Sequence, residues 1–386
     1  MTENPTLAIT RLTLTGFRNY ASLRLDVSAM AVALTGANGS GKTNLLEAIS
    51  LLAPGRGLRG VPFDQLVRHA GPPSWAIAAE VMTSHGAVSI GTGWSGQSEG
   101  NDSASQGRLV IIDGEVQKGS GALGHVMRVL WLTPAMDRLF AGPVSDRRRF
   151  LDRLVAAFDP EQGSRLLVFE KVMRERNLLL EDPRADPAWL SSLEAHMAEA
   201  AVAIAAARLT AIDALRAHIA TAREHSNFPW SDTAIDGEIE TMLSTMPAVR
   251  AEDEYRRLLN DSRRQDRAAG RTLNGPHRSD LVVVHGPKAM PAGLCSTGEQ
   301  KALLIGLILA QARAVTAVSG IAPMLLLDEV AAHLDRERRR GLFEALAALG
   351  CQAWMTGTDV ELFEALRHEA LVFHVEDGIV SEVKRS

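Results

Sequence analysis

The fold of this chain is decided by residues 36–43, which read Gly36-Ala37-Asn38-Gly39-Ser40-Gly41-Lys42-Thr43. This is a complete G-x-x-x-x-G-K-[ST] phosphate-binding loop. The apolar run at residues 30–34 predicts a buried strand before the loop, and residues 44–51 predict a helix after it. A strand, a glycine loop and a helix in this order direct consecutive backbone N–H groups at one anion. The stretch therefore predicts a nucleoside triphosphate site; the matched flanks disfavour the alternative, a chance glycine-rich turn.

Positions within the loop have distinct expected roles. Gly36 and Gly41 allow the turn, and Gly39 leaves room for the backbone to approach a phosphate. Lys42 is expected to reach the β- and γ-phosphates of ATP, and the Thr43 hydroxyl is expected to bind Mg²⁺. The expected nucleotide-binding set is completed by Ala37, Asn38 and Ser40.

The length of 386 residues predicts two or three domains. The composition, 46% hydrophobic and 23% charged, is typical of a globular protein. No targeting segment is expected, and the longest apolar run, at residues 302–310, is too short to cross a bilayer, so no membrane partner is expected. Cys295 and Cys351 are too few for a disulfide framework and indicate a reducing, cytoplasmic setting. With a net charge of −5, any nucleic-acid binding must come from local basic patches.

Three regions follow from the pattern of the chain. Residues 7–35 predict three short strands, and residues 75–118 predict an antiparallel group with a Gly/Ser-rich loop at 93–107. Helices dominate from residue 145 to 267, and strands alternate with helices after Gly270. The sequence therefore predicts an α/β protein: a mixed sheet with an antiparallel β subdomain, interrupted by an inserted α-helical lobe. The expected parts are residues 1–140, 141–270 and 271–386. Their later elements are expected to be helices at 161–180, 188–223, 252–267, 299–318 and 336–349 and strands at 281–284, 324–327, 351–355, 371–375 and 379–383, the last two as edge strands.

A second motif lies at the end of the apolar strand 324–327, where Asp328 and Glu329 follow. Asp328 is placed to hold Mg²⁺, and Glu329 is placed to polarise an attacking water as general base. A strand ending in two acids is common by itself, so its meaning comes from its pairing with the phosphate loop. Lys42 and Asp328 are 328 − 42 = 286 residues apart. Because one nucleotide site needs both, the two ends of the chain are expected to fold together.

Between these motifs lies Cys295-Ser296-Thr297-Gly298-Glu299-Gln300-Lys301, at the start of an apolar helix. Ser296 and Gly298 are expected to form a second anion site, and an ordinary helix cap is the alternative. The order of motifs resembles the ATP-binding-cassette (ABC) family of ATPases. In that family the signature segment of one subunit closes on the nucleotide of another, which implies an ATP-dependent homodimer. By the same resemblance, residues 331–335 correspond to the family's D-loop.

A narrower resemblance rests on four segments in order, namely residues 16–20, 142–152, 275–281 and 296–301. Together they resemble the RecF family, recombination mediators of the SMC-like branch of ABC-type ATPases. The resemblance implies an ATPase head, ATP-dependent dimerisation on double-stranded DNA near single-strand gaps and junctions, and slow ATP hydrolysis. It also implies work with RecO, RecR and RecA-type proteins in repair, replication and the SOS response. Arg18 becomes a nucleotide-site residue by this resemblance.

The chain departs from the family pattern at several positions. No switch histidine follows strand 351–355, and Thr358 is the substitute expected to sense the γ-phosphate. Ser279 stands where the family usually carries an acid, and the Q-loop glutamine is not located. A transporter subunit is a competing interpretation, but it predicts a short insert between the nucleotide motifs. A structural SMC-type protein would require hundreds of coiled-coil residues.

Basic clusters are the candidates for DNA contact. Residues 263–278 carry five arginines against one aspartate, a net charge of 5 − 1 = +4. Arginine forks match phosphate oxygens, although a charged helix face is often only solvated. The candidate DNA-binding residues are Arg147, Arg148, Arg149, Arg263, Arg264 and Arg267.

Overall fold

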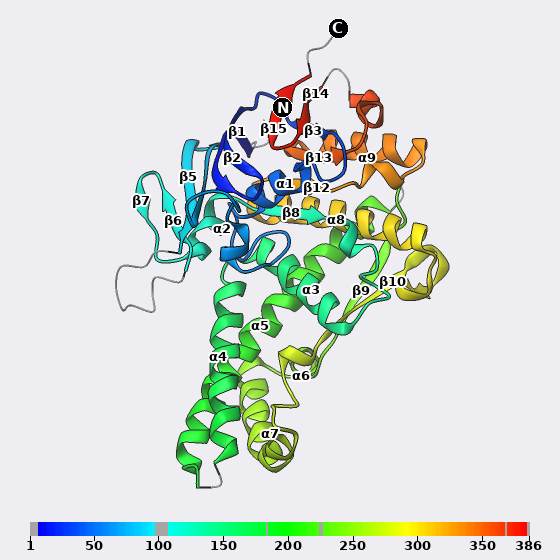
Figure 1. Ribbon diagram of the computed structural model, residues 1–386. Helices are drawn as coiled ribbons and strands as arrows, with labels where there is room; N and C mark the ends of the chain where they lie inside the picture. The colour runs from blue at the N-terminus through cyan, green and yellow to red at the C-terminus, as the bar shows by residue number, and fades with distance from the viewer. Residues whose placement is uncertain (1–6, 97–106, 183, 224–226, 367–368, 384–386) are drawn as a thin grey trace. The chain divides into compact units, whose positions relative to one another are not determined.

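The computed structural model describes residues 7–96, 107–182, 184–223, 227–366 and 369–383 (Figure 1). The chain forms two compact units. Unit 1 consists of Met1–Asp137, Glu224–Phe228 and Leu304–Ser386, and unit 2 consists of Arg138–Arg223 and Pro229–Leu303. The division into functional domains expected from the sequence stays a prediction.

Unit 1 is built on a sheet whose described strands lie in the order β15, β14, β3, β13, β12, β8. All neighbours pair in parallel except β14 and β15. Its central strands are buried almost throughout, as expected for a parallel sheet covered on both faces. The strands are β3 (Ala31–Thr35), β8 (Val129–Leu132), β12 (Met324–Leu327), β13 (Ala353–Gly357), β14 (Ala370–Glu376) and β15 (Ile379–Glu382).

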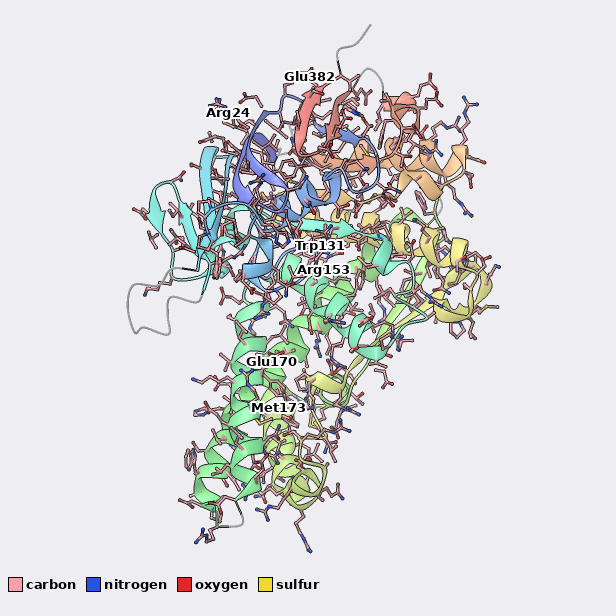
Figure 2. The ribbon with its side chains drawn as sticks, viewed as in Figure 1. Arg24, Trp131, Arg153, Glu170, Met173 and Glu382 are labelled. Carbon is pink, nitrogen blue, oxygen red and sulfur yellow. The ribbon has the colours of Figure 1, made fainter. Side chains whose placement is uncertain are left out.

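The carboxyl ends of these parallel strands lie at the same end of the sheet. In open α/β sheets, ligands bind at this end. Helix α1 (Lys42–Ser50) follows β3 directly, and α9 (Arg336–Leu349) connects β12 to β13. The strand pattern confirms the predicted mixed sheet, with two corrections. Strand β14 lies inside the sheet because it pairs with β3, so only β15 is an edge strand of the predicted pair. Strand β8, on which the labelled Trp131 of Figure 2 lies, was missed; it forms the opposite edge.

A second, antiparallel sheet of unit 1 has the order β2, β1, β4, β5, β6, β7. Alternate residues of β1 and β4 are buried, so one face packs inward. This confirms the predicted antiparallel subdomain; residues 97–106 of the predicted loop lie outside the described residues. The strands are β1 (Ala8–Phe17), β2 (Tyr20–Asp26), β4 (Ser74–Thr83), β5 (Gly86–Ser95), β6 (Leu109–Ile112) and β7 (Glu115–Val116), and the short helix α2 covers Leu123–Val126.

Unit 2 is mainly helical. Its helices are α3 (Val144–Phe158), α4 (Gln162–Glu181), α5 (Pro187–Ala222), α6 (Glu238–Thr245) and α7 (Ala248–Ala269). Alanines on α5 let α4 and α7 approach closely around a core that includes Phe169, Tyr255 and Leu259. Met173 of α4 packs against this core, whereas Glu170 of the same helix is exposed (Figure 2).

The predicted strand near residue 281 exists but belongs to unit 2, in a three-stranded sheet ordered β11, β10, β9. Its partner β9 was not predicted, because residues 231–236 show no regular alternation. The strands are β9 (Ser231–Asp236), β10 (Asp280–His285) and β11 (Met290–Pro291). Short 3-10 turns lie at Phe63–Leu66, Ser120–Ala122, Pro134–Met136, Pro276–Arg278, Gly286–Lys288, Ala292–Leu294, Ala331–His333 and Val360–Leu366.

Helix α8 (Thr297–Ser319) begins in unit 2 and continues in unit 1. Among the described residues it is the one helix whose length and composition would allow a membrane span. Its most apolar window is 67% buried within the protein, as in the core helix of a globular protein. The helix therefore gives only weak evidence of a membrane span.

Buried charges connect the helices of unit 2. The Arg176 guanidinium on α4 is fully buried and donates to Glu194 of α5 at 3.0 Å and to Asp266 of α7 at 2.7 Å. Further along α5, the equally buried Arg208 donates to Asp152 at 2.8 Å and to Glu240 at 3.0 Å. Each arginine also reaches a main-chain carbonyl. The two networks fix the helices in register, because an unpaired buried charge is very costly.

We expect Arg176→Met to lower the free energy of unfolding by about 3–5 kcal/mol, because the buried Asp266 carboxylate loses the arginine that pairs with it. Urea unfolding followed by circular dichroism measures this. The control is Arg256→Met on α7, whose ion pair with Asp253 is half exposed, so the expected cost is below about 1 kcal/mol. Equal costs for the two variants would show that the buried network does not hold the helices.

Candidate nucleotide site

The phosphate loop has the predicted strand–loop–helix form between β3 and α1. Gly36, Gly39 and Gly41 have φ values of 139°, 84° and 118°, which side chains rarely adopt. A Cβ at Gly36 would lie 2.2 Å from the Val375 carbonyl oxygen, and one at Gly41 would lie 2.4 Å from Asn19 Nδ2. At Gly39, by contrast, no atom of the described residues beyond its chain neighbours lies within 4 Å of where a Cβ would be. Packing therefore explains the outer glycines, whereas Gly39 leaves open space beside the loop.

The segment after β1 supports this loop. The Tyr20 hydroxyl donates to the Gly41 carbonyl at 3.0 Å, and Asn19 Nδ2 donates to the Ser40 carbonyl at 3.1 Å. Burial raises the pKa of Tyr20, so its hydroxyl remains a donor. These bonds give residues 19–20 a structural function that the sequence motif alone did not reveal.

Arg18 was predicted to bind nucleotide, and the structure shows its guanidinium on a buried acid of α1. It donates to both carboxylate oxygens of Glu47, at 2.9 and 3.0 Å, and to the Gln65 carbonyl at 3.0 Å. Arg59 also reaches Glu47, at 2.6 Å. A nucleotide contact by Arg18 stays a prediction.

The Lys42 ammonium lies against its own loop, donating to the Gly36 carbonyl at 2.7 Å and the Ala37 carbonyl at 2.8 Å. Burial lowers the pKa of Lys42, and the nearby Glu329 and Asp328 oppose this shift. Ser40 Oγ is buried without a hydrogen-bond partner among the described residues, and no side chain caps α1. An anion at the loop would satisfy these donors, so the residues present fit a triphosphate.

The two distant motifs meet at Thr43 and Asp328. The Thr43 hydroxyl lies 2.9 and 3.1 Å from the two carboxylate oxygens of Asp328, across 285 residues of sequence. A hydroxyl and a carboxylate are hard oxygen donors that suit Mg²⁺. Glu329 follows with φ of 53°, an uncommon value for a residue with a side chain.

Thr356, at the end of β13, was not singled out from the sequence. Its hydroxyl donates to Asp328 Oδ1 at 2.9 Å and accepts from the Glu329 N–H at 2.8 Å. Thr358, the predicted sensor, is exposed two residues later, and its hydroxyl lies 3.2 Å from Asp359 Oδ2. Its role stays a prediction.

The signature segment lies in unit 2, at the start of α8. Both the N–H and the hydroxyl of Ser296 donate to Glu299 Oε2, at 3.0 and 2.9 Å. Lys288 also binds Glu299, and these bonds, that of Lys288 first, lower the pKa of Glu299 to about 2. The bond from the Ser296 N–H to the Glu299 carboxylate is one of the two bonds of a capping box, so the observed geometry is close to the cap alternative. Gly298 is exposed with open space around it. An anion-binding role for Ser296 and Gly298 stays a prediction.

The sequence is similar to a known protein family over nearly its whole length. The sequence profile of the RecF/RecN/SMC N-terminal domain matches residues 8–381. The DNA replication and repair protein RecF of Mesorhizobium japonicum is 52% identical over 373 residues, covering 96% of this chain and 97% of that protein. This chain belongs to the RecF family. The protein of the same name from Brucella suis is 51% identical over 373 residues, with 96% and 95% covered.

Solved structures agree on the fold. A structure of the recombination mediator protein RecF-ATPrS in the RecFOR pathway has a TM-score of 0.85 at 23% identity, covering 99% of both chains. An Smc head domain from Pyrococcus furiosus has a TM-score of 0.53 at 15% identity, covering 98% of this chain and 96% of that one. These matches confirm the ABC-type ATPase head fold.

The three candidate DNA arginines on α3 differ in availability. Arg147 donates to both oxygens of Asp280, at 2.8 and 2.7 Å, and also to the Gly142 carbonyl. Arg148 is partly buried and donates to the Ser279 carbonyl at 3.2 Å. Arg149 is 79% exposed, and among the residues that the structure describes its one ion pair is the local pair with Asp146. Arg149 therefore has the most accessible guanidinium of the three. DNA contact by any of these arginines stays a prediction.

The arginines on α7 show the same contrast. Arg263 binds Glu194 and Ser191, and Arg267 donates to the Leu180 carbonyl at 2.6 Å. Both thus hold α7 to neighbouring helices. Arg264 is exposed, and within the described part of the chain no ion pair of its guanidinium is found.

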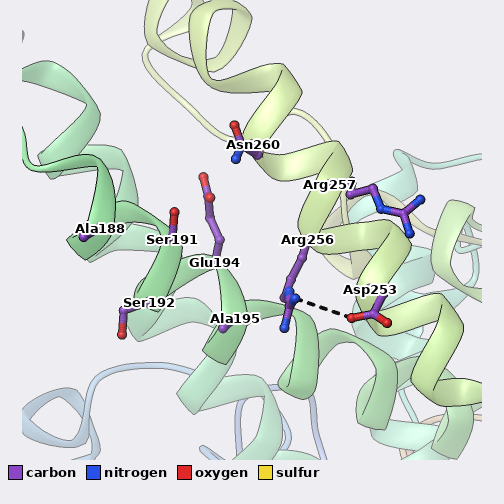
Figure 3. A pocket seen from close by; sticks show the side chains of 9 residues that line it. All are labelled: Ala188, Ser191, Ser192, Glu194, Ala195, Asp253, Arg256, Arg257 and Asn260. Atoms are coloured by element: carbon purple, nitrogen blue, oxygen red, sulfur yellow. Dashed lines mark ion pairs between the residues drawn. The ribbon is translucent and has the colours of Figure 1, made fainter.

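A hollow of about 700 Å³ lies between α5 and α7 (Figure 3). Arg256 and Arg257 line it, but they pair with Asp253 at 3.4 Å and Glu254 at 2.8 Å. Its arginine charges are therefore compensated locally, and it lacks the excess of positive charge that a phosphate site needs.

We expect Gly36→Ala to lower the free energy of unfolding more than Gly39→Ala. Both substitutions force an unfavourable φ, which costs about 1–3 kcal/mol. Only Gly36→Ala also drives a methyl group into the Val375 carbonyl. Urea unfolding without nucleotide measures the difference; a larger cost at Gly39 would contradict the loop packing described.

Proposed function

We propose that this RecF-family chain is an ATP-dependent DNA-binding protein of recombinational repair and replication restart, acting in the cytoplasm. It dimerises on duplex DNA near single-strand gaps and junctions, hydrolyses ATP slowly, and helps RecO- and RecR-type partners load a RecA-type protein. The observation that carries the proposal is the Thr43–Asp328 contact, which joins the phosphate loop to the acidic strand end. The name of the relatives, DNA replication and repair protein, supports its biological setting.

The proposed nucleotide chemistry uses four side chains of unit 1. Lys42 contacts the β- and γ-phosphates, and Thr43 and Asp328 hold Mg²⁺, which supplies positive charge against the phosphates. Glu329 accepts a proton from the attacking water. The orphaned Ser40 hydroxyl and the uncapped start of α1 support this arrangement.

The proposed dimer makes ATP a clamp signal. The exposed start of α8, with Ser296 and Gly298, meets the nucleotide held by the partner's phosphate loop, and the segment 331–335 lies at the seam. Binding closes the dimer, and hydrolysis opens it. In this proposal Ser296 exchanges its bond to Glu299 for one to the γ-phosphate.

Different substitutions should affect ATP binding and ATP hydrolysis separately. We expect Lys42→Met to lose ATP binding, because the only loop cation is removed. Glu329→Gln should bind ATP like the parent but hydrolyse it about 10²–10⁴-fold more slowly, because it lacks the general base. Titration with a fluorescent ATP analogue and single-turnover hydrolysis measure the two steps. Unchanged hydrolysis in Lys42→Met would refute the site.

Dimerisation should require Ser296. Ser296→Arg should bind ATP as the parent does and remain monomeric in sedimentation velocity with ATP and Mg²⁺, because the arginine fills the space of the partner's phosphate. Mixed with Lys42→Met chains, it should form pairs with at most one working site. An ATP-dependent Ser296→Arg dimer would place the seam elsewhere.

DNA affinity should depend on Arg264, the exposed arginine of α7 for which no ion pair is found within the described part of the chain. We expect Arg264→Ala to weaken duplex binding regardless of sequence and to reduce the log–log salt slope by about 0.9, because one phosphate is no longer neutralised. Arg257→Ala is the matched control on α7, because its guanidinium is already paired with Glu254. Fluorescence anisotropy with ATP at several salt concentrations measures both. An unchanged slope in Arg264→Ala would mean that this arginine is only solvated.

A further inference from the structure

One buried hydroxyl lies between the two acids of the nucleotide site. From its hydrogen bonds we infer that Thr356 is a positioning residue that sets Asp328 and Glu329 in place together. The inference rests on the proposed ATPase function of this site. Neither the phosphate-loop motif nor the acidic motif contains Thr356, which comes from a third segment of the chain.

Sheet register brings this third segment to the acids. Strand β13 lies between β3 and β12, and Met355 pairs with Leu327. Thr356 therefore lies beside the first residue beyond β12, which is Asp328. Its side chain is fully buried, so its hydroxyl must find partners within the protein.

The hydroxyl uses its donor and an acceptor position on different targets. It donates to Asp328 Oδ1 at 2.9 Å, and it accepts from the backbone N–H of Glu329 at 2.8 Å. Because Thr43 also lies 2.9 Å from Asp328 Oδ1, the carboxylate is held from two sides. A hydroxyl can serve both bonds at once, since it carries one proton and two lone pairs. A valine of the same shape can serve neither.

The bond to Glu329 acts at a strained point of the backbone. Glu329 has φ of 53°, a conformation that a residue with a side chain keeps only when its surroundings hold it. Thr356 fixes the N–H of this same residue. Loss of the hydroxyl would let the Glu329 peptide relax and move the carboxylate proposed as general base. A base must stay within hydrogen-bond reach of its water, so a small movement is sufficient to slow the reaction.

Three substitutions at this position separate the hydroxyl from the side-chain volume. Thr356→Val keeps the shape and removes both hydrogen bonds, Thr356→Ala also removes volume, and Thr356→Ser keeps the hydroxyl. The matched control is Thr92→Val in β5, where a buried threonine hydroxyl donates to the Leu109 carbonyl at 2.9 Å, far from the nucleotide-site motifs in sequence. All four proteins are compared with the parent by urea unfolding, so that only folded variants are interpreted.

The first measurement needs no nucleotide. The Glu329 amide should exchange its hydrogen at least about tenfold faster in Thr356→Val and Thr356→Ala. The reason is that its N–H loses the hydrogen bond to the Thr356 hydroxyl. Thr356→Ser and Thr92→Val should match the parent at this amide. If Thr356→Val exchanges like the parent, the inference is overturned. If Thr356→Val and Thr356→Ala do not fold, Thr356→Ser decides: fast exchange at Glu329 in that folded variant overturns the inference.

The second measurement is the Mg²⁺ concentration that half-saturates binding of a fluorescent ATP analogue. It should rise about tenfold or more in Thr356→Val and Thr356→Ala, because Asp328 loses its fixed orientation. Thr356→Ser should restore the parental value. A parent that shows no Mg²⁺-dependent nucleotide binding would refute the proposed function. A parent that binds, with a folded Thr356→Val that has the same Mg²⁺ requirement, would refute only the role of Thr356.

Discussion

The hydrogen bond between Thr43 and Asp328 is the contact on which the nucleotide site depends. Its partners are 285 residues apart in sequence, so the site exists only when the amino- and carboxyl-terminal segments of unit 1 form one sheet. Parallel pairing of β3, β13 and β12 brings the two segments together, because the carboxyl ends of these strands lie at the same end of the sheet. Every role proposed for Lys42 and Glu329 requires this arrangement of the strand ends.

Charges are used differently in the two units. In unit 1 the acids and the lysine lie close together at the candidate site, where the Ser40 hydroxyl has no partner among the described residues. In unit 2 the buried arginines Arg176 and Arg208 are matched by carboxylates, and their function is to hold helices. An arginine is therefore a useful candidate for DNA contact only when its guanidinium is exposed and not matched by a carboxylate in the described part of the chain, as for Arg264.

The sequence predicts the site better than its supporting contacts. The glycine loop and the acids Asp328 and Glu329 are readable because their residue types and spacing are demanded by phosphate chemistry, and the family comparisons confirm the fold. Periodicity predicted the long helices within a few residues. It did not predict β8 or β9, because a four-residue buried strand carries no distinct period and the other strand does not alternate.

Thr356 could not be identified from its local sequence, because its function comes from strand order, which brings β13 beside β12. For the arginine clusters, the sequence gives the number of charges but not their partners. Only the structure shows that Arg147 is paired with Asp280 and Arg263 with Glu194.

The central claim, that Thr43 and Asp328 act as one Mg²⁺-dependent site, is tested most directly by a double-mutant cycle. ATP affinity would be measured at fixed Mg²⁺ for the parent, Thr43→Val, Asp328→Asn and the double variant. A coupling free energy between about 0.5 and 3 kcal/mol is expected, because the two residues share one ligand and one hydrogen bond. Additive losses, within about 0.3–0.5 kcal/mol, would contradict it, because they are what independent sites give.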